Sequence, residues 1–290
     1  MKKEKNSHPY PIMIKNLLPI IFSLAFTTLC GQETIRYKQI DTVNLYLEIY
    51  RPEKKEIKKP LPAIVFFFGG GWRNGDRHHF LEQAKYFSKR NMVCILADYR
   101  TESKHGTSPF IALQDAKTAM RYVRSNADDL GIDPNRITAS GGSAGGHLAA
   151  ATAFIQKYND PNDDISIDCK PNALILFNPV IDNGPAGYGY ERIGSAYKDF
   201  SPLHNIQKDP PPTIFFLGTK DRYIPVETAA YYQTVMEKTG GRCELHIYKD
   251  KIHGFFNPQF KDMYKETVFE TDKFLQSLGY LSRQSKIKVN

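Results

Sequence analysis

Residues 136–147 read RITASGGSAGGH, and the pentapeptide G-x-S-x-G occupies positions 141–145. A strand-like apolar run comes before it, and an alanine-rich, helix-like run follows at residues 147–153. A strand, a sharp turn permitted by glycine and a helix would lift the serine hydroxyl above the edge of a sheet. This context predicts that Ser143 is a nucleophile. Because glycine and serine are common residues, a purely structural turn is the alternative.

Strand-like and helix-like segments alternate over most of the chain. Strand-like segments, most of them continuously apolar, lie at residues 62–68, 92–97, 173–177, 213–217 and 244–248. Helical spacing is found at residues 112–123, 226–238 and 260–278. The alternation predicts an α/β fold with a doubly wound, mostly parallel sheet. Segments 35–40 and 43–50 alternate polar and apolar residues, which predicts an antiparallel edge.

The chain contains no segment of linker composition, so one domain is expected from residue 33 to 280. Residues 182–211 are rich in Gly, Tyr, Ser and Pro without a clear period, and they predict a small cap-like insertion. The sequence DPNR at 133–136 predicts a turn before the strand that leads to Ser143. Residues 281–290 form a short basic tail.

Residues 1–31 have the pattern of a secretory signal peptide. Lysines precede an apolar stretch at residues 17–29, which is short for a membrane span, and the small Gly31 suits cleavage. A secreted or periplasmic location is therefore expected, with no stable membrane span once the signal is removed. An uncleaved anchor is the alternative. Lipidation at Cys30 is a lesser one, because the preceding Leu29 is large.

The composition disfavours several classes of function. The 290 residues are 41% hydrophobic and 24% charged, as in ordinary globular proteins. The net charge is +8, and the basic residues are spread along the chain without a recognition motif, so no nucleic-acid partner is expected. Neither C-x-x-C nor H-E-x-x-H occurs, so no metal site and no cofactor are expected. Whether Cys169 and Cys243 form a disulfide is left open.

A serine hydroxyl needs a base within hydrogen-bonding reach, and the base needs a group that orients it. In a doubly wound sheet such side chains gather where the strands end at their carboxyl edge. Asp221 follows the strand at 213–217 and His253 follows the strand at 244–248, which predicts the chain order Ser, Asp, His. Asp182 is the alternative acid. The other histidines weighed as bases, in packed, loop or cap positions, are His78, His79, His105, His147, His204 and His246.

Acyl transfer also requires donors for a developing oxyanion. Residues 69–72, Gly-Gly-Gly-Trp, follow a buried strand, and the glycines let backbone N–H groups approach a ligand closely. The predicted donors are the amides of Gly70, Gly71 and Ala144, and Trp72 is expected to contact the substrate. A phosphate-binding loop is disfavoured, because the G-x-x-x-x-G-K-[ST] pattern is absent.

Several motifs in order make the chain resemble the esterase/lipase branch of the α/β-hydrolases, including hormone-sensitive-lipase-like and feruloyl-esterase-like secreted carboxylesterases. They are GGGW at 69–72, DYR at 98–100, the helix from Asp115 to Arg124, GSAGGH at 142–147, DRYIP at 221–225 and HGF at 253–255. Phe68 departs from this pattern, since it replaces the histidine of HGGG and can brace the loop only by packing. The resemblance implies structural roles for Asp98, Arg100 and Asp115.

The resemblance further implies an α/β-hydrolase fold and a secreted serine hydrolase that acts on carboxylic esters. The expected export, Trp72 and the Gly- and Tyr-rich segment at residues 184–190 suit a polar or aromatic ester, so a small-molecule or carbohydrate-linked ester is expected as the substrate, such as an acyl group on a polysaccharide. Two alternatives remain at this point. One is a peptidase of the prolyl-oligopeptidase type, and the other is a non-catalytic binding protein on the same fold.

Overall fold

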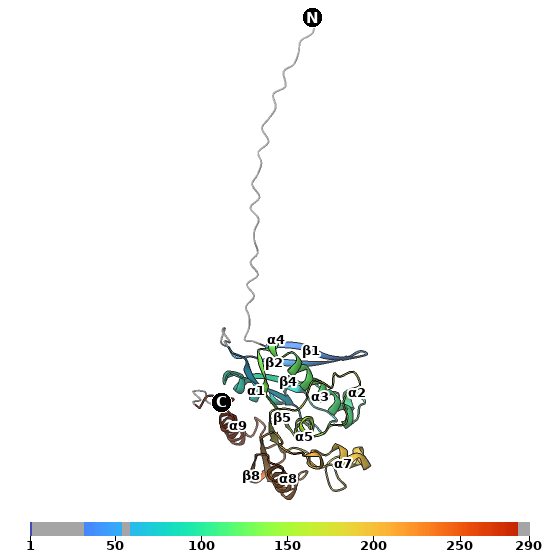
Figure 1. Cartoon of the computed structure of the whole chain (residues 1–290), viewed down its shortest axis with the longest axis vertical. Helices are drawn as coiled ribbons and strands as arrows, with labels where there is room; N and C mark the ends of the chain where they lie inside the picture. Colours follow the sequence, from blue (N-terminus) through green and yellow to red (C-terminus); the bar gives the residue numbers. More distant parts are fainter. Residues whose placement is uncertain (2–31, 54–58, 284–290) are drawn as a thin grey trace.

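The computed structural model describes residues 1, 32–53 and 59–283 (Figure 1). The predicted signal peptide lies outside the described residues except for Met1, so the expected export stays a prediction. Of the basic tail, residues 281–283 are described. No helix of the described residues is long and apolar enough to cross a membrane.

Within the described residues the strands form an eight-stranded sheet of order β1-β2-β4-β3-β5-β6-β7-β8. The strands are β1 (Gln32–Ile40), β2 (Val43–Tyr50), β3 (Leu61–Phe67), β4 (Val93–Ala97), β5 (Ile132–Gly142), β6 (Ala173–Phe177), β7 (Thr213–Lys220) and β8 (Cys243–Ile252). Strands β3 to β8 pair in parallel, whereas β1 and β2 are antiparallel. The predicted doubly wound sheet with an antiparallel N-terminal edge is confirmed.

Helices cover both faces of this sheet (Figure 1). The longer ones are α1 (Leu81–Lys89), α3 (Pro109–Ser125), α5 (Ala144–Phe154), α8 (Val226–Lys238) and α9 (Lys261–Ser277). The short ones are η1 (Arg77–Phe80), α2 (Glu102–His105), α4 (Ala127–Leu130), α6 (Tyr190–Ile193), η2 (Gly194–Ala196), α7 (Tyr197–Phe200) and η3 (Pro202–Asn205). The segment expected as a cap, residues 182–211, contains the last four of these.

Two hydrophobic cores explain the continuously apolar strands. On β3, Val65 and Phe67 face the core that contains α3, α5 and α8, whereas Ile64 and Phe66 face the core that contains α1 and α9. Because side chains alternate along a strand, a strand covered on both faces is apolar at every position. All four side chains are at most 2% exposed.

The turn predicted at residues 133–136 is instead an irregularity within β5. Leu61 of β3 pairs with Ile132, but Ala63 already pairs with Ile137, so extra residues are accommodated on the β5 side. Asp133 closes this bulge by accepting the N–H of Asn135 at 2.9 Å. The strand therefore begins earlier than its apolar run, because a bulge keeps the chain within the sheet where a turn would leave it.

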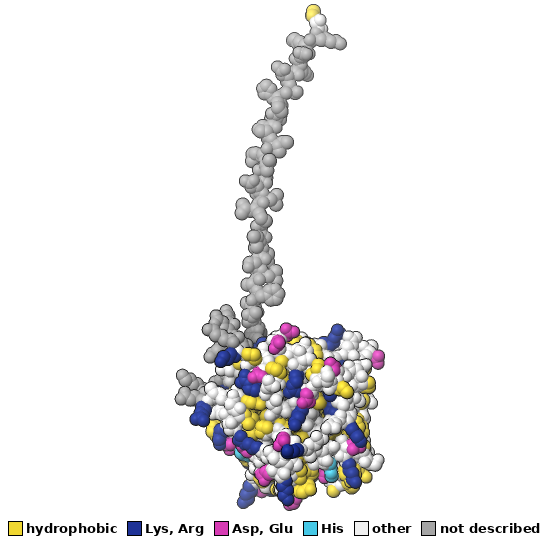
Figure 2. Space-filling model, in the orientation of Figure 1, with side chains coloured by type: hydrophobic (Ala, Val, Ile, Leu, Met, Phe, Trp, Pro, Cys, Tyr) yellow, Lys and Arg dark blue, Asp and Glu magenta, His cyan; other side chains and the backbone are white. Residues whose placement is uncertain are grey.

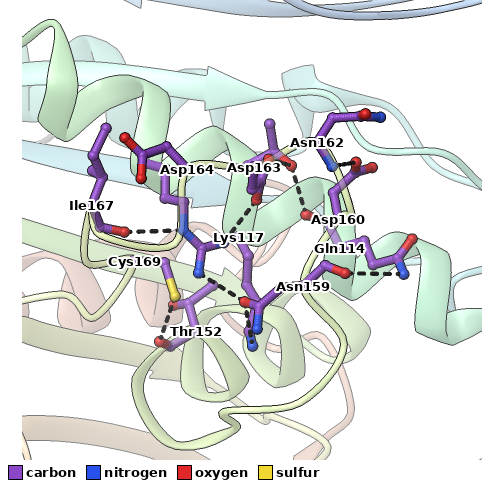
Figure 3. A network of polar contacts seen from close by, with 12 residues as sticks. Gln114, Lys117, Thr152, Asn159, Asp160, Asn162, Asp163, Asp164, Ile167 and Cys169 are labelled. Carbon is purple, nitrogen blue, oxygen red and sulfur yellow. Dashed lines mark hydrogen bonds and ion pairs between the residues drawn. The ribbon is translucent and has the colours of Figure 1, made fainter.

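Buried cations on α3 fix the loop that follows α5 (Figure 3). Lys117 donates to the carbonyl of Lys157 at 2.5 Å and to Asn159 Oδ1 at 3.2 Å, and burial lowers its pKa to about 8. Arg121 donates to Asp163 Oδ2 at 2.7 Å and to the carbonyl of Ile167 at 3.0 Å. These bonds fix the segment that follows α5, the helix that carries Ser143 at its N-terminus.

The acidic residues taken as structural do form ion pairs within the fold. Asp115 is fully buried, and Arg100 binds both of its oxygens at 2.8 Å while Lys38 binds one at 2.7 Å. Asp98 pairs with Arg77 at 2.9 Å. These contacts join α3, β1 and the loop after β4, so they support the sheet edge and leave the acids unavailable for catalysis.

The described cysteines, Cys94, Cys169 and Cys243, are buried free thiols, so the disulfide left open by the sequence is not formed in the structure. Burial raises the pKa of each thiol. At the surface, Lys and Arg side chains are interspersed with Asp and Glu over the face shown in Figure 2. This face therefore presents no extended field of one sign.

Candidate active site

Ser143 stands on a strained turn between β5 and α5. Its backbone angles, φ 55° and ψ −121°, are rare for a residue with a side chain. The Ser143 N–H donates to Phe177 O at 3.0 Å, and its carbonyl accepts from His147 N and Val180 N. A Cβ at Gly145 would lie 2.1 Å from Phe67 O, so only glycine allows the turn to approach β3. The turn thus has the geometry expected of a nucleophile elbow.

Asp221 and His253 meet at the carboxyl ends of β7 and β8. His253 Nδ1 donates to Asp221 Oδ2 at 2.7 Å, while Asp221 Oδ1 accepts the N–H groups of Tyr223 and Ile224 at 2.9 and 3.1 Å. The Asp221 side chain is fully buried, and that of His253 is 19% exposed. Because Nδ1 carries the donated proton, Nε2 of the neutral ring keeps a lone pair with which to accept another.

Ser143 and His253 line one pocket of about 250 Å³. Its walls are Gly69, Gly70, Gly71, His79, Ser143, Asn178, Tyr188, Tyr223, His253, Gly254, Phe256 and Asn257. Within the described part of the chain, no hydrogen bond joins the Ser143 hydroxyl to His253. Such bonds are often long in free enzymes and tighten when substrate binds. The structure therefore brings the predicted serine, base and acid to one place.

The loop of residues 69–71, here called the glycine loop, forms one wall of the pocket. Gly70 and Gly71 have φ of 124° and 65°, and a Cβ on Gly70 would lie 2.1 Å from Asn74 O. Among the described residues, neither the Gly70 nor the Gly71 N–H has a backbone acceptor. Ala144 is the first residue of α5, where an N–H has no acceptor within the helix. All three predicted donors are thus available to a ligand oxygen.

Phe68 supports the glycine loop by packing, as expected. Its ring stacks on Tyr99 with centroids 3.9 Å apart, and Tyr99 Oη donates to the Phe68 carbonyl at 2.7 Å. The loop also receives a polar contact from residues 182–211, because Arg192 donates to Gly71 O at 2.7 Å. Arg192 lies at a position that nothing in the sequence pattern singled out.

The expected substrate contact by Trp72 is wrong for this structure. The indole is 1% exposed and is absent from the pocket that Ser143 lines. Trp72 has a φ of 57°, and its ring packs against His147, Tyr188 and Phe200. The left-handed turn after the glycines directs it beneath the cap segment. Tyr188 and Tyr223 line the pocket in its place.

Asn178 is a site residue that the sequence analysis missed. It is fully buried at the end of β6, with φ 35°. Its Oδ1 accepts the N–H of Gly254 at 2.9 Å, and its Nδ2 lies 3.4 Å from His253 Nε2. Asn178 therefore holds the start of the loop at residues 253–257, called here the histidine loop. The sequence pattern that could have indicated Asn178 is a polar residue directly after a buried apolar strand.

The alternative acid and bases have other partners. Asp182 contacts His204 at 3.3 Å and caps Gly184, and neither Asp182 nor His204 lines the pocket. His78 pairs with Glu48 and Asp76, His105 accepts from Thr101 N, and His246 lies on β8. Besides His253, His79 is the histidine that borders the pocket. Within the described ranges, no group of three or more His, Cys, Asp or Glu side chains is arranged to hold a metal ion.

His147 is a buried structural histidine with a consequence for acid stability. Its Nε2 donates to Phe200 O at 2.9 Å, and burial lowers its pKa to about 4. In the unfolded chain the imidazole pKa is about 6.5, so below that pH the unfolded state gains a proton that the folded state excludes. This depressed pKa lowers the free energy of unfolding as the pH falls from 6.5 to 4, by about 2 kcal/mol at pH 5.

We therefore expect His147→Gln to lose less stability than the wild type on going from pH 7.5 to pH 5, the difference being about 2 kcal/mol. Urea unfolding of both proteins at the two pH values measures it. Glutamine keeps an N–H donor but does not titrate, so identical pH dependence in the two proteins would contradict the assignment.

Comparison with known families gives two matches, one over the N-terminal part of the fold and one over its C-terminal part. A family model described as BD-FAE matches residues 47–187, and one described as Prolyl oligopeptidase family matches residues 181–278. The first contains the glycine loop and Ser143. The second contains Asp221 and His253.

Individual proteins give longer matches. Acetylxylan esterase of Xylanibacter ruminicola is 28% identical over 234 residues, which cover 75% of this chain and 44% of that protein. Esterase LipC of Mycobacterium tuberculosis is 28% identical over 205 residues, covering 63% of this chain and 50% of that protein. The chain thus spans about half the length of these curated relatives.

Solved structures of Thermogutta terrifontis esterase 2 match nearly end to end. The form phosphoramylated by tabun superimposes with a TM-score of 0.84 at 42% identity, covering 88% of this chain and 97% of that one. A propionate-bound form of the same enzyme has a TM-score of 0.82 at 42% identity, with the same coverage.

Proposed function

The chain belongs to the esterase/lipase branch of the α/β-hydrolases, and on that premise we propose that it hydrolyses carboxylic esters through an acyl-enzyme formed on Ser143. The observation that carries this proposal is the 2.7 Å bond between His253 Nδ1 and Asp221, beside a serine held on a strained turn in the same pocket. The bond places the proton on Nδ1, so Nε2, which lies 3.4 Å from Asn178 Nδ2, carries the lone pair of a base.

The proposed reaction has two halves. Ser143 Oγ attacks the acyl carbon while His253 Nε2 takes its proton, and the tetrahedral oxyanion is held by the N–H groups of Gly70, Gly71 and Ala144. Collapse breaks the bond to the alcohol, which leaves with the proton from His253. Water then attacks the acyl-enzyme by the same route and releases the carboxylic acid. Asp221 stays ionised and stabilises the imidazolium in both halves.

We propose that the acyl group is short and that the alcohol is carbohydrate-linked. A pocket of about 250 Å³ lies below the volume that drug-sized ligands require, and Tyr188 and Tyr223 offer aromatic faces at its border. Propionate is bound in one T. terrifontis esterase 2 structure, and an acetylxylan esterase is among the relatives. Both support short acyl chains, and the second supports a polysaccharide. The pattern of residues 1–31 supports secretion or a periplasmic location.

A panel of substrates tests the class of ester. We expect kcat/KM for p-nitrophenyl esters to be highest with acetate, propionate or butyrate, and to fall for longer chains because the pocket has no room for them. Acetylated xylan is expected to release acetate, and methyl ferulate tests an aromatic acyl group. Activity confined to long acyl chains would contradict the proposal.

The same panel addresses the second candidate function, peptidase activity, which is favoured by the Prolyl oligopeptidase match over residues 181–278. Aminoacyl and prolyl p-nitroanilides are the corresponding substrates. We expect them to be hydrolysed far more slowly than p-nitrophenyl acetate. The reverse preference would assign the chain to peptide hydrolysis.

A further inference from the structure

His79 connects the two loops that carry the proposed oxyanion donors and base. It lies on η1, and its Nδ1 accepts the N–H of Gly69 at 3.0 Å. Its Nε2 lies 2.7 Å from Asn257 Oδ1. A backbone N–H only donates, so Nδ1 bears the lone pair and Nε2 bears the proton. The ring is therefore neutral, and it donates to the oxygen of Asn257.

Both ends of this bridge belong to the walls of the pocket. Gly69 begins the glycine loop, and Asn257 ends the histidine loop, where its own N–H donates to Gly254 O at 3.1 Å. The His79 ring packs against Phe80 and Phe256, with centroids 4.8 and 5.7 Å away, and these two rings also stack on each other. Burial lowers the pKa of His79, which favours the neutral ring that the bridge needs.

Phe68 cannot supply this connection, because its side chain has no polar atom and packs against Tyr99 instead. Gly70 follows Gly69 with a φ of 124°, and consecutive glycines rotate easily. A fixed acceptor for the Gly69 N–H therefore restricts the peptide planes that point N–H groups into the pocket.

We propose that His79 is a positioning residue, which holds the Gly70 and Gly71 amides at a fixed place relative to His253 by tying the glycine loop to the histidine loop. This inference rests on the proposed ester hydrolysis. His79 takes no proton in the reaction. It acts through the loops on either side of its ring, so its removal affects stabilisation of the transition state more than binding of the ester.

The test compares His79→Phe with His79→Asn. Phenylalanine keeps an aromatic ring against Phe80 and Phe256 but loses both hydrogen bonds. Asparagine places an acceptor near the position of Nδ1. Removing an oxyanion donor outright costs about 10²–10³ in kcat, so misplacing the donors is expected to cost about 10–100-fold. For His79→Phe we expect that loss in kcat for p-nitrophenyl acetate, with KM changed by less than about 3-fold.

Asparagine keeps an acceptor for the Gly69 N–H but cannot reach Asn257, so His79→Asn is expected to recover part of the lost kcat, to about the level of Asn257→Ala. A trifluoromethyl ketone, which forms a tetrahedral oxyanion on the serine, should bind His79→Phe more weakly in proportion to the loss in kcat/KM. Asn257→Ala breaks the other end of the bridge at a half-buried position and should lower kcat in the same direction. Circular dichroism and thermal unfolding verify that each variant is folded.

A folded His79→Phe or Asn257→Ala variant with wild-type kcat and wild-type inhibitor affinity would overturn the positioning role. Equal losses in His79→Phe and His79→Asn would also overturn it, because the acceptor for the Gly69 N–H would then contribute nothing to kcat. Failure of the proposed function looks different, since the wild-type chain itself would then hydrolyse none of the esters.

Discussion

Replacing Ser143 by alanine is expected to abolish ester hydrolysis while leaving the fold intact. The change removes the one atom that forms the acyl bond, and losses of about 10⁴ or more in kcat are typical for a member of such a triad. The hydroxyl makes no hydrogen bond within the described part of the chain, whereas the backbone of Ser143 makes three. Steady-state hydrolysis of p-nitrophenyl acetate by both proteins measures the effect.

Two controls accompany this variant. Far-UV circular dichroism and the thermal midpoint should match the wild type, because the strained backbone is held by Phe177, His147 and Val180. A fluorophosphonate probe should label the wild type and leave Ser143→Ala unlabelled. Turnover of the alanine variant near the wild-type rate would rule out the acyl-enzyme mechanism. A wild type that resists the probe would favour a binding protein on this fold.

The sheet was predictable because most of its strands are recognisable from their own sequence. Strands such as β3 and β4 are covered on both faces, and they are apolar at every position for that reason. The bulge at residues 133–136 was not predictable, because DPNR suits a turn as well as an irregular strand. Tertiary pairing with β3 decides between the two, and no local pattern contains that pairing.

The positions of Ser143, Asp221 and His253 were predictable for a related reason. Each follows a strand, and parallel strands end at the same edge, so the topology alone brings them together. No comparable rule predicts the residues that support the site. Asn178 and His79 act through atoms of loops that are distant in sequence, and their partners emerge only when the loops converge.

Trp72 shows that a residue next to a site in the sequence need not contact that site. It directly follows the glycine loop, yet its positive φ turns the side chain away from the pocket and under the cap segment. Arg192 then lies over the same ring, 5.3 Å from its centroid, while binding Gly71 O. The tryptophan thus supports the glycine loop from behind.

Exchange of Asp221 for asparagine is expected to lower kcat by about 10⁴, whereas Asp182→Asn should be much milder. The Asp221 side chain is fully buried and accepts a hydrogen bond from His253 Nδ1. An asparagine can present its NH₂ group there, which favours the tautomer with the proton on Nε2 and removes the base. Asp182 is 32% exposed and contacts His204, outside the pocket. Measuring kcat for p-nitrophenyl acetate in both variants, at matched folding, compares the two acids.

The comparison is informative because both aspartates follow strands and both contact a histidine. What distinguishes them is the environment. The Asp221 side chain has no exposed surface, and its second oxygen accepts two backbone N–H groups, which fix the carboxylate in one orientation. A positively charged imidazole formed during reaction is stabilised most by a carboxylate that is buried and already oriented. If Asp182→Asn were the more damaging change, the acid would have to be reassigned, and with it the cap segment would become part of the catalytic apparatus.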